Sequence, residues 1–168
     1  MTTATVMLRV LVGIAGLFAV GAFADPPKGY RFLAYDEGLR AAQAQQKPIF
    51  LYFGRYGCGW CEKTNREAFS NPKLKAAYER DFVLVYVDAE SGKRLTLPNG
   101  ERITEMELGA RFKAFATPLF AYLQPDGSQI FKISGIQSAQ DFFVYDRFVT
   151  GGHYKTEDIR QFIAEQPK

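Results

Sequence analysis

The only two cysteines of this chain lie three positions apart, in the sequence Cys58-Gly59-Trp60-Cys61. Thiol–disulfide exchange needs a thiolate that attacks and a second thiol close enough to resolve the mixed disulfide. On a helix, side chains three positions apart lie on the same face, one turn from each other. The spacing therefore favours a dithiol that opens and closes, with a structural disulfide and a metal site as the alternatives.

Both alternatives explain the pair less well. A disulfide stabilises a fold most when it closes a long loop, and a two-residue spacer constrains little of the unfolded chain. Structural zinc binds about four nitrogen or sulfur ligands, and His153 is the only histidine available to join the cysteines. We therefore predict no metal site and interpret His153 as a residue of a surface loop.

The residues on both sides of the cysteine pair predict the elements that position it. The apolar residues 49–53 predict a buried strand, residues 54–57 a turn, and residues 62–69 the continuation of a helix. Cys58 would then stand at a helix N-terminus, where unpaired N–H groups and the helix dipole favour the thiolate. We predict that Cys58 is the nucleophile and that Cys61 resolves the mixed disulfide.

The rest of the chain alternates between helical and strand patterns. Residues 82–87 are continuously apolar and predict a central strand buried on both faces. Hairpin signals occur at Asn99-Gly100, within an insertion spanning residues 90–102, and at Gly127, between strands 119–123 and 129–134. Helices are predicted over residues 35–46, 72–78, 104–113, 139–149 and 156–165. This order predicts an α/β fold with a mixed central sheet flanked by helices.

The first 24 residues have the pattern of a secretory signal peptide. Arg9 precedes an apolar run over residues 10–20, and Ala22-Phe23-Ala24 forms a small-x-small cleavage site. The apolar run is shorter than the about 20 residues that span a bilayer, although an uncleaved anchor remains the alternative. We expect export to the periplasm, no stable membrane insertion after cleavage, and one domain over residues 25–168.

Charge excludes one class of partner. The formal net charge is +3, and basic residues are interleaved with acidic ones, as in the run Lys73, Lys75, Glu79, Arg80 and Asp81. Nucleic-acid-binding proteins concentrate basic residues in a patch or stripe. We therefore expect no nucleic-acid partner.

Over about residues 46–135 the chain resembles the thioredoxin superfamily. The resemblance rests on the strand before the cysteines, the Cys58–Cys61 motif, the strand over residues 82–87, and Thr117-Pro118 opening a hairpin. It implies a thioredoxin fold, a redox-active disulfide as the only cofactor, and a cis Pro118 beside that disulfide. An ordinary trans proline at the start of a strand is the alternative. Thr117, with Gly59 and Trp60, would then contact a substrate strand.

Within this superfamily, the chain most resembles exported thioredoxin-like proteins of the SoxW type. The features that suggest this are the leader, the insertion and the tail over residues 142–154. This resemblance implies a periplasmic thiol:disulfide oxidoreductase that reduces a disulfide-containing protein substrate and takes electrons from a membrane thiol reductant. Two alternatives stay open: a disulfide oxidase or isomerase of secreted proteins, and a non-catalytic module that holds copper or a partner.

One position departs from the thioredoxin pattern. Thioredoxins carry a buried carboxylate six residues before the first cysteine, where this chain has Tyr52, a poor base near neutral pH. The proton acceptor for Cys61 is therefore unassigned among Glu62, Glu67 and water.

Residues next to the motif carry further expectations. Arg55 and Lys63 would lower the pKa of the Cys58 thiol if they lie close to it, or are ordinary solvated charges. Trp60 is expected to be exposed, either on a docking surface or packed on the preceding loop. The helix over residues 139–149 carries aromatic side chains at spacings of three and four, which indicates core packing.

Overall fold

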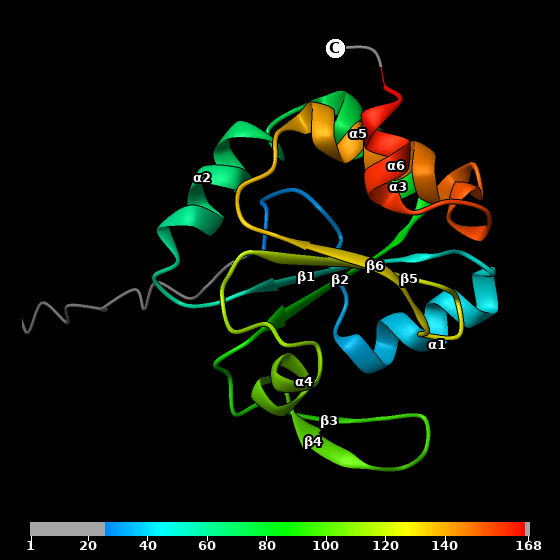
Figure 1. Ribbon diagram of the computed structural model, residues 1–168. Helices are drawn as coiled ribbons and strands as arrows, with labels where there is room; N and C mark the ends of the chain where they lie inside the picture. Colours follow the sequence, from blue (N-terminus) through cyan, green and yellow to red (C-terminus); the bar gives the residue numbers. More distant parts are fainter. Residues whose placement is uncertain (1–25, 167–168) are drawn as a thin grey trace, which may run out of the picture.

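The computed structural model describes residues 26–166, and the predicted signal peptide lies outside the described residues. A four-stranded sheet forms its centre (Figure 1). The strands are β1 (Ile49–Gly54), β2 (Val83–Asp88), β3 (Arg94–Thr96), β4 (Arg102–Thr104), β5 (Leu119–Leu123) and β6 (Gln129–Ser134). The helices are α1 (Tyr35–Gln45), α2 (Gly59–Glu67), α3 (Pro72–Asp81), α4 (Glu105–Arg111), α5 (Ala139–Thr150) and α6 (Ile159–Ala164). Within the described part of the chain, no helix is both long and apolar enough to cross a membrane.

The central sheet has the strand order β2-β1-β5-β6. Strand β1 runs parallel to β2 and antiparallel to β5, and β5 and β6 form an antiparallel hairpin. All six residues of β1 are buried, as expected for an uninterrupted apolar strand that is covered on both faces. The predicted mixed sheet flanked by helices is therefore confirmed.

Side chains of β1 alternate between two cores because successive residues of a strand point to opposite faces. Phe50 and Tyr52 belong to an aromatic-rich core under α2, α3 and α5, which also contains both cysteines. Ile49, Leu51 and Phe53 face the second core, under α1 and α4. Figure 1 shows these two helical layers on opposite sides of the sheet.

The predicted hairpin insertion is present as β3 and β4, which pair with each other outside the central sheet. Leu95 and Ile103 lie opposite each other and are buried in the second core. Helix α4 follows directly, and Thr104 with Glu107 forms a capping box at its start. The insertion is thus anchored by apolar contacts and leads into the segment before Pro118.

Several helix ends differ from the sequence-based prediction. Helix α3 continues to Asp81, and Phe82, expected in the strand, caps its C-terminus. The last helix begins at Ile159 because Asp158 caps it and a 3-10 turn over His153–Lys155 precedes it. The start of the last helix is set by the side chain that accepts its first free N–H groups, a choice that apolar spacing does not reveal.

Candidate functional site

The two cysteines form a disulfide at the start of α2. Their Cα atoms are 5.2 Å apart, and the residues are 5% and 6% exposed. Cys58 is the N-cap residue, and the backbone N–H of Cys61 donates a hydrogen bond to Cys58 Sγ over 3.1 Å. The predicted placement of Cys58 at a helix N-terminus is confirmed.

The loop between β1 and α2 presents Cys58 beyond the carboxyl end of the strand. Its backbone turns back on itself, because the N–H of Cys58 donates to the carbonyl of Arg55 over 3.3 Å. Gly57 has φ +64, in the left-handed region where a side chain would be strained. Glycine at this position therefore allows the tight turn that leads from β1 to Cys58.

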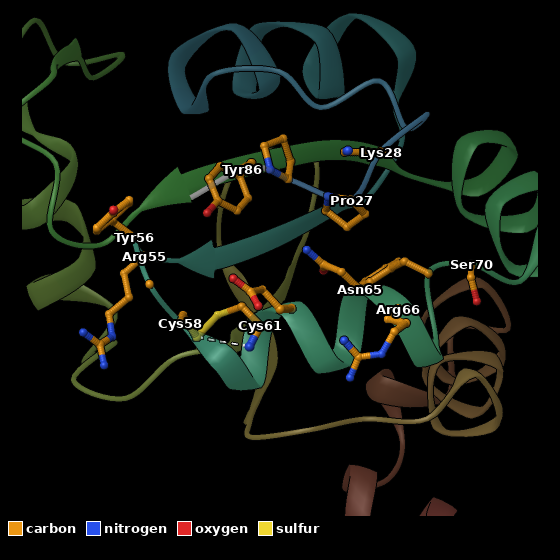
Figure 2. Close-up of a pocket in the computed structure, with 14 residues that line it drawn as sticks. Pro27, Lys28, Arg55, Tyr56, Cys58, Cys61, Asn65, Arg66, Ser70 and Tyr86 are labelled. Carbon is orange, nitrogen blue, oxygen red and sulfur yellow. Dashed lines mark hydrogen bonds between the residues drawn. A yellow bond between two sulfur atoms is a disulfide. The ribbon is translucent and has the colours of Figure 1, made fainter. Parts of the chain in front are cut away.

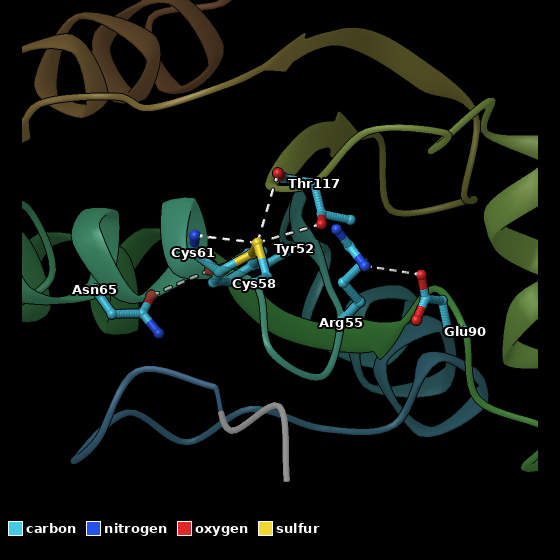
Figure 3. Close-up of a disulfide and its surroundings, with 7 residues drawn as sticks. All are labelled: Tyr52, Arg55, Cys58, Cys61, Asn65, Glu90 and Thr117. Carbon is cyan, nitrogen blue, oxygen red and sulfur yellow. Dashed lines mark hydrogen bonds and ion pairs between the residues drawn. A yellow bond between two sulfur atoms is a disulfide. The ribbon is translucent and has the colours of Figure 1, made fainter. Parts of the chain in front are cut away.

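A second segment approaches the disulfide from the start of β5. The Thr117–Pro118 peptide bond is cis. The Thr117 hydroxyl donates to Cys58 Sγ over 3.3 Å, and the Thr117 carbonyl oxygen lies 3.5 Å from the same sulfur (Figure 3). In the disulfide this sulfur carries no proton, so the second approach is a contact, whereas a reduced Cys58 thiol has a proton to donate there.

The structure thus brings Thr117 and Pro118 to Cys58 across 59 positions of sequence. Sequence reasoning expected the backbone of Thr117 at this place but missed its hydroxyl. The available signal was the residue type itself, a hydroxyl-bearing side chain directly before the proline.

The spacer between the cysteines faces outward. Trp60 is 62% exposed, and a Cβ added to Gly59 would meet nothing within 4 Å. The expected exposure of Trp60 is confirmed. Other large apolar side chains are exposed on the neighbouring loops, and we call this set the apolar rim: Tyr56, Trp60, Phe115 and Ile136.

Chain connectivity places the apolar rim around the disulfide. Phe115 lies two residues before Thr117, and Ile136 follows Gly135, whose N–H donates to the Pro118 carbonyl over 2.9 Å. Sequence reasoning did not select Tyr56, Phe115 or Ile136, because an isolated apolar residue in a loop carries no periodic signal.

A cleft of about 790 Å³ opens beside the disulfide. Figure 2 shows Pro27 and Lys28, from the segment before α1, across this cleft from Asn65 and Arg66 of α2. Both cysteines line it, together with Glu62 and Tyr86 among others. The disulfide therefore borders a hollow that is open to solvent.

Tyr52 lies beneath this region and is fully buried. Its hydroxyl donates to Asn65 Oδ1 over 3.2 Å (Figure 3). Burial, and to a lesser degree the neighbouring Tyr86, raises the pKa of Tyr52 above its ordinary value. The hydroxyl stays protonated at neutral pH, which confirms the expectation that Tyr52 is a poor base.

The charged neighbours of the motif are solvated. Arg55 forms an ion pair with Glu90 over 3.1 Å, and both side chains are about half exposed. Such a pair contributes little energy and shares the arginine charge with a carboxylate. The interpretation of Arg55 as an ordinary surface charge fits this arrangement.

His153 lies in the 3-10 turn and not in the lining of the cleft, with its Nδ1 3.1 Å from Glu157 Oε1. Within residues 26–166, no three His, Cys, Asp or Glu side chains are grouped so that they could hold a metal ion.

Comparisons with known proteins agree with this geometry. A family model described as a thioredoxin-like domain matches residues 35–148. The human spermatogenesis-associated protein 20 is 39% identical over 54 residues, which make up 32% of this chain and 7% of the human protein. The chain thus matches only a small part of that relative.

Two solved structures are similar to the chain over most of their length. A thioredoxin-fold protein from Helicobacter pylori superposes with a TM-score of 0.61 and 21% identity, over 72% of this chain and 80% of its own. A thioredoxin from Thermus thermophilus superposes with a TM-score of 0.58 and 26% identity, over 71% of this chain and 86% of its own.

Proposed function

The chain belongs to the family of thioredoxin-like domains, and from this premise we propose that it is a thiol:disulfide oxidoreductase that reduces disulfides of partner proteins. The observation that carries the proposal is the Cys58–Cys61 disulfide at a helix N-terminus, with Thr117 directly beside the first sulfur. A bridge used only for stability would gain nothing from donors aimed at one of its sulfurs.

Reduction of a partner begins with the dithiol form. The Cys58 thiolate attacks one sulfur of the partner disulfide and forms a mixed disulfide, while the partner's second sulfur leaves as a thiolate and takes up a proton. The Cys61 thiolate then attacks Cys58 Sγ, which releases the partner's first sulfur and restores the Cys58–Cys61 bond. Two electrons pass from the dithiol to the partner.

The site stabilises the attacking form of Cys58. The N–H of Cys61 and the hydroxyl of Thr117 both point at Cys58 Sγ, over 3.1 and 3.3 Å. Hydrogen bonds to an anion are stronger than those to a neutral group, and the positive end of the α2 dipole adds to them. These donors lower the energy of the thiolate more than that of the disulfide.

We propose that the partner binds as an extended segment beside Thr117. The Thr117 N–H makes no hydrogen bond among the described residues, so it is available to a partner carbonyl. The apolar rim surrounds the place where this extended segment would lie. It would contact the side chains that flank the partner's cysteine. Gly59, Trp60 and Pro118 contribute the remaining surface.

The compartment and the electron donor belong to the same proposal. The leader pattern supports export to the periplasm, and the resemblance to SoxW-type proteins supports a membrane thiol reductant as the donor. Because the periplasm is oxidising, sustained reduction there requires such a supply of electrons.

Insulin reduction by dithiothreitol tests the activity. Wild type should accelerate precipitation of the insulin B chain, and Cys58→Ser should abolish the acceleration because the nucleophile is lost. Cys61→Ser is the matched control, since it keeps the nucleophile and should trap mixed disulfide. Equal rates for wild type and Cys58→Ser would rule out the proposed enzyme activity. Copper that stays bound through purification would instead favour the non-catalytic module.

Equilibration with glutathione mixtures tests the direction of electron flow. A reductase should have a reduction potential near that of thioredoxin, about −270 mV. A value close to about −120 mV, typical of a strong oxidant, would instead support an oxidase or isomerase of secreted proteins.

A further inference from the structure

The resolving step needs a base for the Cys61 thiol, and the residue at the thioredoxin acid position cannot supply it. Tyr52 is buried, stays protonated, and donates its hydroxyl to Asn65. The proton of Cys61 must therefore leave by another route.

The cleft beside the disulfide offers that route. It reaches the Cys61 side of the disulfide, between α2 and the segment that contains Pro27 and Lys28 (Figure 2). An open hollow of about 790 Å³ with charged and polar side chains in its lining is large enough for many water molecules. A Cys61 thiol at its edge is therefore in reach of water even though the residue is only 6% exposed.

Of the titratable side chains that line the cleft, only Glu62 is a carboxylate. The others are Lys28, Arg55, Tyr56, Arg66 and Tyr86. Lysine and arginine side chains are hydrogen-bond donors without a lone pair for a proton, and a neutral tyrosine hydroxyl is a much weaker base than a carboxylate. Glu62 is thus the one lining side chain suited to accept a proton.

Position on α2 separates Glu62 from the other acidic candidate. Glu62 directly follows Cys61 in the first turn, whereas Glu67 is five residues further on and does not line the cleft. Five residues correspond to a rotation of about 140° around the helix axis, which turns Glu67 to another face. Arg66, four residues after Glu62, lines the same cleft.

We propose that Glu62 accepts the Cys61 proton through water in this cleft during resolution of the mixed disulfide. The Cys61 S–H bond breaks, its proton passes through water to the Glu62 carboxylate, and the thiolate attacks Cys58 Sγ. The Cys58–partner bond breaks as the Cys58–Cys61 bond forms, and the departing thiolate takes a proton from Glu62 or solvent. The inference rests on the proposed function.

Stopped-flow reaction of the reduced protein with an aromatic disulfide tests the proposal, because each half of the reagent leaves as a coloured thiolate. The first phase reports attack by Cys58 and the second reports resolution by Cys61. Near neutral pH, Glu62→Gln should slow the second phase about ten-fold or more and leave the first nearly unchanged. Glu67→Gln is the matched control and should leave both phases unchanged.

The pH profile separates a proton acceptor from a structural role. Alkaline buffer supplies hydroxide that can take the Cys61 proton in place of Glu62, so the Glu62→Gln deficit should shrink as the pH rises. Added formate should restore part of the rate at neutral pH. A deficit that is equal at every pH, or identical profiles for wild type and Glu62→Gln, would overturn the proposal. Failure of the proposed function would appear differently, as no insulin reduction by wild type.

Discussion

At the scale of single residues, the two sulfurs of the disulfide have different surroundings. Cys58 Sγ accepts hydrogen bonds from the Cys61 N–H and the Thr117 hydroxyl, and both cysteines line the cleft that contains Glu62. Donors aimed at a sulfur favour its anion, and access to water and a carboxylate favours proton exchange. The donors at Cys58 Sγ are consistent with the proposed order, in which Cys58 is the nucleophile and Cys61 the resolving thiol.

Replacement of Thr117 by valine tests the hydroxyl. Thr117→Val keeps the shape of the side chain but removes the donor to the Cys58 thiolate. A hydrogen bond to a charged group contributes about 1.5 kcal/mol or more, so we expect the pKa of the Cys58 thiol to rise by about one unit. The pH dependence of Cys58 alkylation in a Cys61→Ser background measures it.

Thr117→Ser is the control, because it restores the hydroxyl and should keep the pKa near that of wild type. An unchanged pKa in Thr117→Val would show that the hydroxyl does not act on the thiolate.

At the scale of elements, α1 packs against β2 through a glycine. A Cβ added to Gly38 would lie 2.1 Å from Cγ2 of Val85, a residue of β2 that is fully buried. The two groups would overlap. Glycine normally weakens a helix interior, so its presence here reflects the close approach of α1 to the sheet. That approach covers the second core, which holds β1 in place on the face away from the disulfide.

Gly38→Ala should therefore destabilise the protein although alanine is the better helix former. Overpacking a tight core costs about 1–3 kcal/mol, which exceeds the gain of about 1 kcal/mol in helix propensity. Urea unfolding followed by circular dichroism measures the free energy of unfolding. The exposed position Gln43 on the same helix provides a control, since Gln43→Ala should change stability little.

The double variant Gly38→Ala/Val85→Ala checks the cause. If the added methyl group meets Val85, the double variant should lose less stability than the sum of the two single variants. Additive losses would contradict the packing argument.

At the scale of the whole molecule, a buried carboxyl group makes stability depend on pH. Asp146 of α5 is 8% exposed, and one of its oxygens, Oδ1, has no hydrogen-bond partner among the described residues. Burial, and then the nearby Asp81, raises the pKa of Asp146 to about 6. An unfolded chain returns this carboxyl to about 3.9.

The direction of the pH effect follows from these two values. Between about pH 4 and pH 6 the folded protein binds the Asp146 proton more tightly than the unfolded chain does, so stability falls as pH rises through this window. Asp146→Asn removes this dependence and keeps the shape of the side chain. Relative to wild type, the variant should gain on the order of 1 kcal/mol at neutral pH and nothing below about pH 4.

Denaturant unfolding of both proteins at a series of pH values measures this difference. A stability difference that stays constant from acid to neutral pH would show that Asp146 does not titrate in this range.

Local sequence signals determined much of the fold. The apolar runs of β1 and β2, the Thr104 capping box and the hairpin at Gly127 are set by hydrogen bonding and burial within a few residues, so their patterns are legible in the chain. The spacing of Cys58 and Cys61 in the same way determined that a disulfide opens a helix. The ends of helices, which depend on competing caps, and of strands differed from the prediction by one to a few residues.

Tertiary structure alone decided which groups meet the sulfurs. Folding brought the Thr117 hydroxyl to Cys58 from 59 positions away, turned Glu62 and not Glu67 toward the cleft, and buried Tyr52 against Asn65. No pattern in the chain reports these contacts, because each depends on how helices pack on two faces of one sheet. The sequence thus determined the cysteine pair and its place at the start of a helix, and packing decided which side chains surround that pair.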